Sequence, residues 1–269
     1  MAFFIYMKRD KPIGIFDSGV GGLTVLKELV TLLPNENFIY YADSANCPYG
    51  TKSYDEIIEL TKKITDFLLS NSCKMIVVAC NTATAAAIDI LRKNYKLPFV
   101  GMEPAVKPAA ETTKTGKIGI LATAGTFEGR LFKQTSKVFA DDVDKIVQVG
   151  EGLVELVEND NYESEEAKEL LSKYILPMVA ASVDKIVLGC THYPFFSDII
   201  QTLTPNTVEV INPAPAVAKR VQYLLEELSL GQIDTESGRI TFYTSGSINA
   251  LERLAKKLFV NRNMSFNEV

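Results

Sequence analysis

The sequence predicts an α/β protein of two similar, pseudo-symmetric lobes, with mainly parallel sheets and a ligand site in the cleft between the lobes. The first observation is an unbroken apolar run at residues 76–79, which is typical of a strand buried on both faces of a sheet. A cysteine and a row of small hydrogen-bonding residues follow at once, at 80–84. The same pattern recurs at residues 185–194. Open α/β sheets bind their ligands at such strand ends.

An internal repeat is the basis for dividing the chain into two lobes. The Ile-Gly-Ile strand and small-residue loop at residues 13–22 recur at 117–126, an offset of 105 residues from Ile13 to Ile118. The two strand-ending cysteines are 110 residues apart, so one repeat period accounts for both pairs. The predicted lobes are residues 1–104 plus 213–269, carrying Asp17 and Cys80, and residues 105–212, carrying Cys190 and His192.

The first lobe is predicted to begin with a strand at residues 12–16 and a glycine-rich loop at 17–22 that leads into a helix from Leu23. Glycines let backbone N–H groups approach a ligand, and a helix start favours an anion. Neither a P-loop nor a GxGxxG motif is present, so a carboxylate is a more natural guest than a polyphosphate. On its own, the loop could equally be a tight turn with Asp17 or Ser18 as the helix cap.

The next elements follow from composition and periodicity. A strand at residues 38–42 leads into a polar loop at 43–52, where Tyr49 stands between Pro and Gly and could wall a pocket. An amphipathic helix follows at residues 54–69. The other predicted strands lie at residues 98–104 (with a Pro-bounded turn), 118–120, 208–211 and 240–244. The other predicted helices lie at residues 85–92, 164–179, 216–228 and 249–259. Residues 212–215 are predicted to form a stiff connection.

Composition favours a soluble globular protein that binds a small molecule. The chain is 47% hydrophobic and 23% charged, and no apolar run approaches membrane-spanning length. A net charge of -5 without basic clusters argues against nucleic-acid binding, and we expect no membrane partner. Residues 2–7 are too short for a signal peptide, so we expect a short arm, or upstream residues if translation begins at Met7, and a cytoplasmic protein.

The four cysteines do not have the spacing of a zinc site. They lack a CxxC pair and the chain has one histidine, so we expect free thiols and no metal. Cys47 and Cys73 lack the strand-end setting and are interpreted as structural. Cys80 and Cys190 could be small buried hydrophobes too, but their recurrence, with His192 two residues after Cys190, favours a functional pair.

Two thiols on opposite sides of a cleft suit the inversion of a carbon stereocentre by proton transfer. One base removes the proton from one face while an acid delivers another to the opposite face, and cysteine can do both as thiolate and as thiol. The field at a helix N-terminus can hold Cys80 as thiolate. Asp17 is a plausible neighbour for Cys80, and His192 for Cys190.

Four motifs resemble those of bacterial glutamate racemase, in the family's order and over residues 12–260. They are residues 16–22 (Phe-Asp-Ser-Gly-Val-Gly-Gly), 47–52 (Cys-Pro-Tyr-Gly-Thr-Lys), 79–83 (Ala-Cys-Asn-Thr-Ala) and 188–194 (Leu-Gly-Cys-Thr-His-Tyr-Pro). The resemblance implies cofactor-independent interconversion of L- and D-glutamate for peptidoglycan synthesis, with a homodimer as a possible assembly.

The resemblance also implies roles for individual residues. Cys80 and Cys190 match the proton donor and acceptor pair. Glu158 matches an acidic residue beside the second cysteine, although its local sequence alone favours a solvated helix face. The residues matching substrate-binding and assisting positions are Asp17, Ser18, Tyr49, Gly50, Asn81, Thr82, Thr191 and His192.

Two other functions remain open at this point. The first is another two-cysteine amino-acid racemase, such as an aspartate racemase, which differs in pocket size. The second is a two-lobed amino-acid binding protein without catalysis, against which the paired thiols and the missing signal sequence weigh. Exchange of the Cα proton of glutamate with solvent deuterium would exclude the binding protein.

Overall fold

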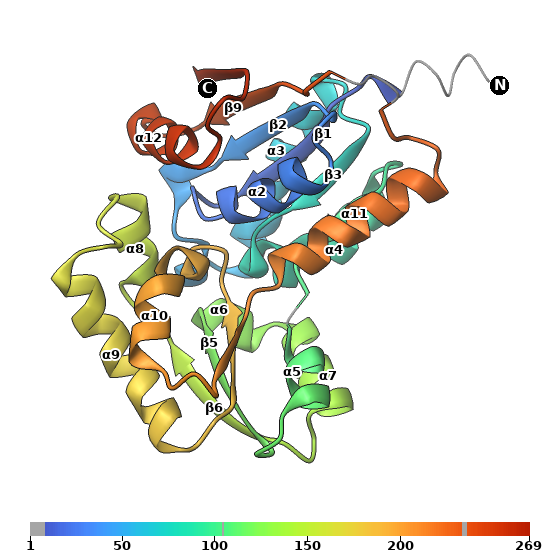
Figure 1. The fold of residues 1–269 in the computed structure, drawn as a ribbon. Helices are drawn as coiled ribbons and strands as arrows, with labels where there is room; N and C mark the ends of the chain where they lie inside the picture. The colour runs from blue at the N-terminus through green and yellow to red at the C-terminus, as the bar shows by residue number, and fades with distance from the viewer. Residues whose placement is uncertain (1–8, 104, 233–235) are drawn as a thin grey trace.

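The fold contains two parallel β-sheets, which Figure 1 shows toward opposite ends of the molecule. The computed structural model describes residues 9–103, 105–232 and 236–269, so the predicted arm at residues 2–7 lies outside the described part. One sheet has six strands in the order β10-β9-β2-β1-β3-β4, and the other has four in the order β6-β5-β7-β8. Every strand pairing among the described residues is parallel. The predicted α/β class is therefore confirmed.

The six-stranded sheet is built from both ends of the chain. Its strands are β1 (Ile13–Asp17), β2 (Phe38–Ala42), β3 (Met75–Val78), β4 (Phe99–Gly101), β9 (Ile240–Thr244) and β10 (Met264–Glu268). Its helices are α2 (Leu23–Leu32), α3 (Tyr54–Ser70), α4 (Asn81–Asn94), α11 (Ala214–Glu227) and α12 (Ile248–Leu258), with short 3-10 turns η1 (Ser44–Asn46) and η2 (Tyr49–Thr51). The strand β10 was not predicted, because it is a half-polar edge strand without a continuous apolar run.

Two hydrophobic layers cover this sheet. Ile13 and Ile15 lie in the same apolar cluster as residues of α2, α11 and α12, whereas Phe16 packs with residues of α3 and α4 on the other face. This division follows from the two-residue repeat of a strand, whose successive side chains point to opposite faces. Both faces are buried, which explains why these strands read as continuous apolar runs.

The four-stranded sheet is formed by the middle of the chain. Its strands are β5 (Lys117–Ala122), β6 (Asp144–Val149), β7 (Lys185–Gly189) and β8 (Glu209–Ile211). Its helices are α5 (Val106–Thr112), α6 (Ala124–Glu128), α7 (Arg130–Phe139), α8 (Leu153–Glu158), α9 (Glu165–Ala180) and α10 (Ser197–Leu203), with η3 at Tyr193–Phe196. In Figure 1, α9 and α10 lie on one side of this sheet, and α5 and α7 on the other. The order β6-β5-β7-β8 repeats the order β2-β1-β3-β4 of the first sheet.

Local capping explains where several of these helices begin. Ser164 caps α9, as predicted, by accepting a hydrogen bond from the backbone N–H of Ala167. Ser53 and Glu56 form a reciprocal capping box at the start of α3. The predicted stiff connection at residues 212–215 is shorter than expected, because α11 already begins at Ala214, where Asn212 accepts the backbone N–H.

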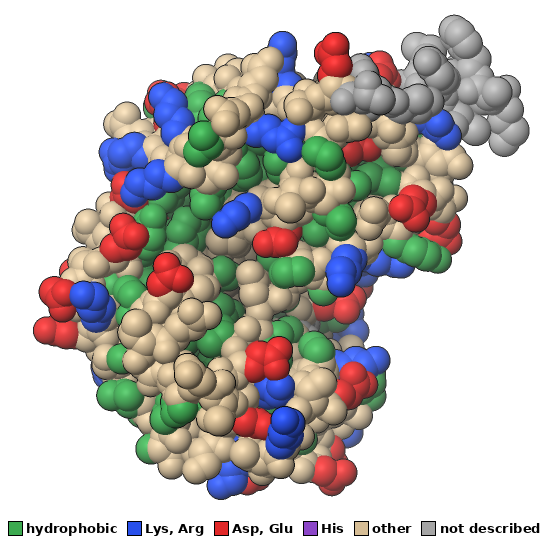
Figure 2. All heavy atoms as spheres, in the orientation of Figure 1, with side chains coloured by type: hydrophobic (Ala, Val, Ile, Leu, Met, Phe, Trp, Pro, Cys, Tyr) green, Lys and Arg blue, Asp and Glu red, His purple; other side chains and the backbone are tan. Residues whose placement is uncertain are grey.

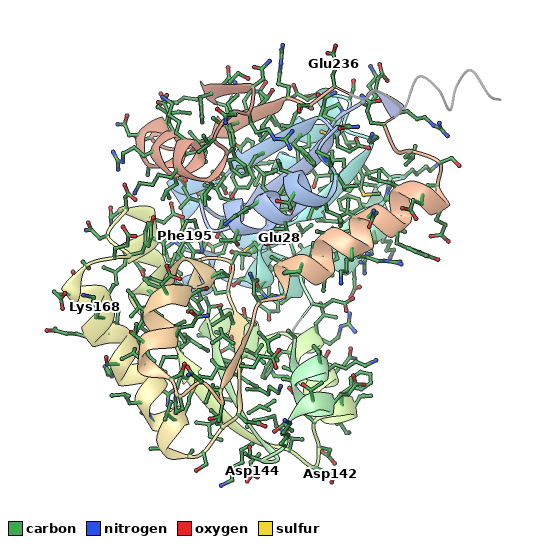
Figure 3. All side chains as sticks on the ribbon, viewed as in Figure 1. Glu28, Asp142, Asp144, Lys168, Phe195 and Glu236 are labelled. Carbon is green, nitrogen blue, oxygen red and sulfur yellow. The ribbon has the colours of Figure 1, made fainter. Side chains whose placement is uncertain are left out.

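The visible surface carries both signs of charge. Lys and Arg alternate with Asp and Glu on the face in Figure 2, and no large basic area gathers there. Figure 3 shows Asp142, Asp144 and Lys168 projecting from the periphery of the half with the four-stranded sheet, and Glu236 from the opposite end. Among the described residues, no helix combines the length and apolar character that crossing a membrane requires.

Candidate active site

The register of the two sheets brings the predicted site residues together. In the first sheet Phe16 pairs with Val78, so the loops that follow β1 and β3 start side by side. In the second sheet Ala122 pairs with Gly189, which places the loops after β5 and β7 side by side in the same way. The carboxyl ends of both sheets contribute to one place in the molecule, because Ser18, Cys80, Thr123 and Cys190, which follow these four strands, line one cavity.

A narrow cavity lies where these loops meet. Its free volume is only about 10 Å³, close to what one water molecule needs, so the cavity is nearly closed in this structure. Both strand-ending cysteines line it. The lining residues are Ser18, Pro48, Tyr49, Gly50, Cys80, Asn81, Thr82, Thr123, Val154, Cys190, Thr191 and His192.

Cys80 occupies the N-cap position of α4. Its sulfur accepts the backbone N–H of Ala83 at 3.4 Å and lies 3.7 Å from the hydroxyl oxygen of Ser18. Burial, and then the charge of Asp17, raise the pKa of Cys80 well above its ordinary value, and the two hydrogen bonds offset only part of this. Burial therefore opposes the thiolate that the helix N-terminus can favour, and the raised pKa favours the thiol form of Cys80.

Asp17 is fully buried at the end of β1. Its carboxylate accepts the backbone N–H of Gly22 at 2.7 Å, the hydroxyl of Thr191 at 3.3 Å and that of Ser18 at 3.4 Å. Desolvation raises the pKa of Asp17, against the lowering effects of the His192 charge and of hydrogen bonds from Gly22 and Cys80. Asp17 thus lies beside Cys80, as predicted, and also contacts the loop of the second cysteine.

His192 connects the second cysteine to an acidic residue. Its Nδ1 lies 3.7 Å from the sulfur of Cys190, and its Nε2 lies 2.7 Å from Oε1 of Glu158. Burial lowers the pKa of His192, but contacts with Cys190, Cys47 and Glu158 outweigh it and leave the pKa raised well above its ordinary value. The expected solvated position of Glu158 is wrong, because the side chain is only 18% exposed and is turned inward.

The glycine-rich loop binds carboxylates of the chain itself. The backbone N–H of Val20 donates to Glu158 at 2.7 Å, just as that of Gly22 donates to Asp17. A Cβ at Gly19 would lie 1.9 Å from Oε1 of Glu158, and one at Gly21 would lie 2.3 Å from Nδ1 of His192. These two backbone N–H groups therefore bind acids of the chain itself, whereas the sequence had predicted a substrate carboxylate at this loop.

The remaining predicted binding residues line the same cavity. The Tyr49 hydroxyl donates to Asp43 at 2.5 Å, and burial raises the pKa of Tyr49, so this residue is a fixed, neutral wall beside Gly50. Oδ1 of Asn81 is buried and has no hydrogen-bond partner among the described residues. A buried acceptor without a partner is unusual and is suited to a donor on a bound ligand.

Cys47, Thr123 and Val154 belong to the site but were not assigned to it from the sequence. Cys47, interpreted as structural, contacts His192, and burial raises the pKa of its thiol to about 11. Thr123 lies 3.0 Å, oxygen to oxygen, from Thr82, and Val154 lines the cavity. The 105-residue repeat contained a signal for Thr123, which is the counterpart of Ser18, and the motif at residues 47–52 contained one for Cys47.

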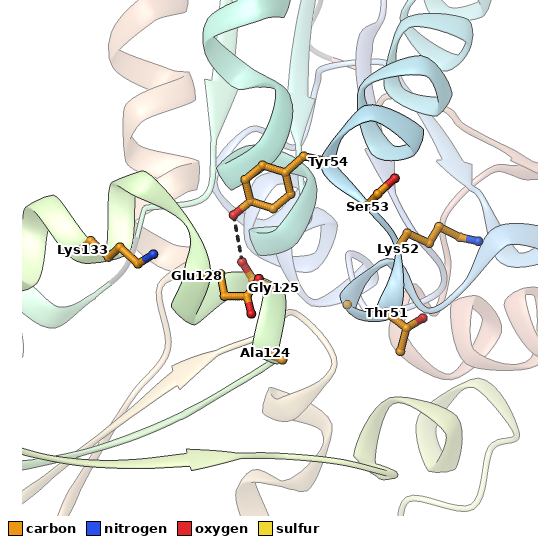
Figure 4. A pocket seen from close by; sticks show the side chains of 9 residues that line it. Thr51, Lys52, Ser53, Tyr54, Ala124, Gly125, Glu128 and Lys133 are labelled. Carbon is orange, nitrogen blue, oxygen red and sulfur yellow. Dashed lines mark hydrogen bonds between the residues drawn. The ribbon is translucent and has the colours of Figure 1, made fainter.

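An open cleft adjoins the cavity. Figure 4 shows residues 51–54 on one side of it and Ala124, Gly125, Glu128 and Lys133 on the other. The Tyr54 hydroxyl donates across the cleft to the carbonyl of Gly125 at 3.3 Å. Because Gly50 lines both the cleft and the cavity, the cleft leads toward the two cysteines.

Comparison with known proteins gives a consistent result. A sequence profile of the family described as Asp/Glu/Hydantoin racemase matches residues 13–221. A glutamate racemase of Herpetosiphon aurantiacus is 46% identical over 238 residues, which cover 88% of this chain and 94% of that protein.

Solved structures agree over nearly the whole chain. The crystal structure of glutamate racemase isoform RacE1 from Bacillus anthracis superposes with a TM-score of 0.87 and 29% identity, covering 97% of this chain and 98% of that one. Escherichia coli glutamate racemase, in complex with L-glutamate and the activator UDP-MurNAc-ala, gives a TM-score of 0.84 and 30% identity, covering 96% and 98%.

Proposed function

We propose a function from the premise that the chain belongs to the Asp/Glu/Hydantoin racemase family and is an isomerase. It interconverts L- and D-glutamate by proton transfer between Cα and two cysteines, without a cofactor. The observation that carries the proposal is that Cys80 and Cys190 line one small cavity from equivalent strand ends of two sheets. We further propose that the lobes comprise residues 1–104 plus 213–269, and residues 105–212.

The proposed step conserves protons. One cysteine enters as thiolate and takes the proton from Cα, whose electron pair stays on carbon, while the other gives its thiol proton to the opposite face. The two cysteines then have exchanged protonation states, and the reverse reaction starts from there. The raised pKa of Cys80 favours its thiol form, so we assign Cys80 as the acid in the state described here.

The neighbouring groups suggest how each cysteine is assisted. His192, kept protonated, can donate to the Cys190 sulfur through Nδ1 and to Glu158 through Nε2. Asp17 interacts with Cys80 and can relay a proton to it. We assign Ser18, Tyr49, Gly50, Thr82 and Thr191 to substrate binding, and Asn81 to the substrate ammonium group, which can donate to its unpaired oxygen.

Circular dichroism of L- and D-glutamate solutions tests the reaction directly. Purified enzyme without added cofactor should abolish the optical signal of either enantiomer. A faster rate on aspartate would instead favour the aspartate racemase alternative, and the absence of deuterium uptake at Cα would favour a binding protein.

A glutamate analogue with a leaving group on Cβ tests the two-face assignment, because its elimination needs only proton abstraction. Cys80→Ala and Cys190→Ala should each abolish racemisation, yet retain elimination with one enantiomer, in opposite senses. Loss of elimination with the same enantiomer in both variants would show that one cysteine is not a base.

The biological setting follows from the same proposal. An enzyme that makes D-glutamate would supply peptidoglycan synthesis and act in the cytoplasm. A homodimer stays a prediction, which sedimentation analysis can test.

A further inference from the structure

A third thiol lies beside the acid and the histidine of the site. One donor atom each from Cys47, Glu158 and His192 can be chosen so that all three lie within 4.8 Å of one another. They come from three separate segments: the loop before η2, the end of α8 and the loop after β7. The proposed racemisation uses His192 and Glu158 but has no role for the sulfur of Cys47.

We propose that Cys47, Glu158 and His192 form an inhibitory binding site for Zn²⁺. Thiolate, imidazole and carboxylate are the ligands zinc takes in proteins, at about 2.0–2.3 Å, so tetrahedral ligands lie about 3.3–3.6 Å apart. The donors need to close by about 1 Å, which side-chain rotation can supply, and the 2.7 Å contact between Glu158 and His192 must widen slightly. Water completes the four ligands, as it does at other three-residue zinc sites.

Charge and access are suited to a cation. A thiolate and a carboxylate neutralise Zn²⁺, while Asp17 adds a further buried acid nearby. Cys47 and Glu158 are both partly exposed, so the ion can reach them from solvent. Binding would release the thiol proton of Cys47 and the proton between His192 and Glu158 to water.

Inhibition rests on the proposed function. A zinc ion bound to His192 prevents this residue from assisting Cys190. The ion also narrows the cavity that both cysteines line. The site is therefore distinct from a cofactor site: the metal stops the reaction, and a chelator restores it.

The test measures metal binding separately from activity. Zn²⁺ is titrated calorimetrically, and Cd²⁺ is used as a probe because its thiolate bond gives an ultraviolet charge-transfer band. The wild-type chain should bind one Zn²⁺ and lose racemisation in proportion. Cys47→Ala should weaken Zn²⁺ binding by at least ~100-fold, since loss of a mere outer-shell partner costs 10–100-fold, whereas Cys73→Ala, at a buried thiol away from the cavity, should bind as the wild type does.

Three results would overturn the inference: no zinc binding by the wild type, wild-type affinity in Cys47→Ala, or a cadmium band that survives in Cys47→Ala and disappears in Cys190→Ala. Should Cys47→Ala misfold, alkylation of the wild type decides the question. Zn²⁺ must protect Cys47 from iodoacetamide, and mass spectrometry showing full alkylation of Cys47 with zinc present would refute the site. Binding without any racemase activity would instead count against the proposed function alone.

Discussion

The contact between Glu158 and His192 allows a quantitative prediction, because Glu158→Gln changes charge while keeping shape. Oε1 of Glu158 accepts both from Nε2 of His192 and from the backbone N–H of Val20, each at 2.7 Å, and an amide oxygen can accept the same two bonds. A charge-assisted hydrogen bond contributes about 1.5–3 kcal/mol and a neutral one about 0.5–1.5 kcal/mol. The difference, about 1–1.5 kcal/mol, corresponds to about one pKa unit, so the pKa of His192 should fall by about that amount.

His192 is the only histidine in the chain, so a single imidazole resonance in a proton NMR titration reports its pKa. The wild-type resonance should titrate well above the ordinary value, and that of Glu158→Gln about one unit lower. Glu155→Gln, on an exposed position of the same helix, is the matched control and should leave the titration unchanged.

The same shift has a consequence for stability, with a defined sign. A histidine whose pKa is raised by folding stabilises the native state fully below its unfolded pKa of about 6.5. This contribution is lost as pH rises through the raised folded pKa. Urea unfolding should therefore show a smaller alkaline loss of stability in Glu158→Gln than in the wild type. An identical histidine titration in the two proteins would refute this account of the charge of His192.

Three further predictions follow from the same geometry. Asp17→Asn should lower kcat by about 10²–10⁴-fold. The Tm should not fall, because burying the charged carboxylate costs desolvation free energy and Asn can still accept the Gly22 N–H. An unchanged rate in kinetics together with a lower Tm in calorimetry would instead indicate a purely structural residue. Gly21→Ala should cost about 10²-fold in kcat/KM, since its Cβ displaces the His192 ring, while Gly231→Ala, which has open space around it, should have no effect. Activity should survive dialysis against a metal chelator and need no pyridoxal phosphate; a preparation that only pyridoxal phosphate reactivates would contradict the two-thiol reaction.

Local sequence determined much of the fold. The buried strands around Ile15, Val77 and Val187 are continuous apolar runs, and the structure has β1, β3 and β7 there. The helix from Tyr54 follows equally from periodicity and from its Ser53 cap. These signals are local, because burial on a sheet or a helix face repeats every two or three to four residues.

The half-polar strands β6 and β10 were not predicted, because they lack such a local burial pattern. No residue of β6 is fully buried, and β10 lies at the sheet edge, so neither has a repeat strong enough to predict a strand. Each is a strand because it pairs with a neighbour, β6 with β5 and β10 with β9.

In the site, too, some features follow from the local sequence and others only from the tertiary structure. The sequence by itself determined that Cys80 and Cys190 end equivalent strands, since each apolar run stops at the cysteine. Only the tertiary structure decided that Glu158 faces His192 and that Cys47 joins them. Those side chains stand on a helix end and a loop whose local sequence suits a solvated surface, and they are enclosed because the carboxyl ends of the two sheets meet at one cavity. Glu158 and His192 are 34 residues apart, and Cys47 is more than 100 residues from both, so their contacts depend on how the elements pack, which no local pattern encodes.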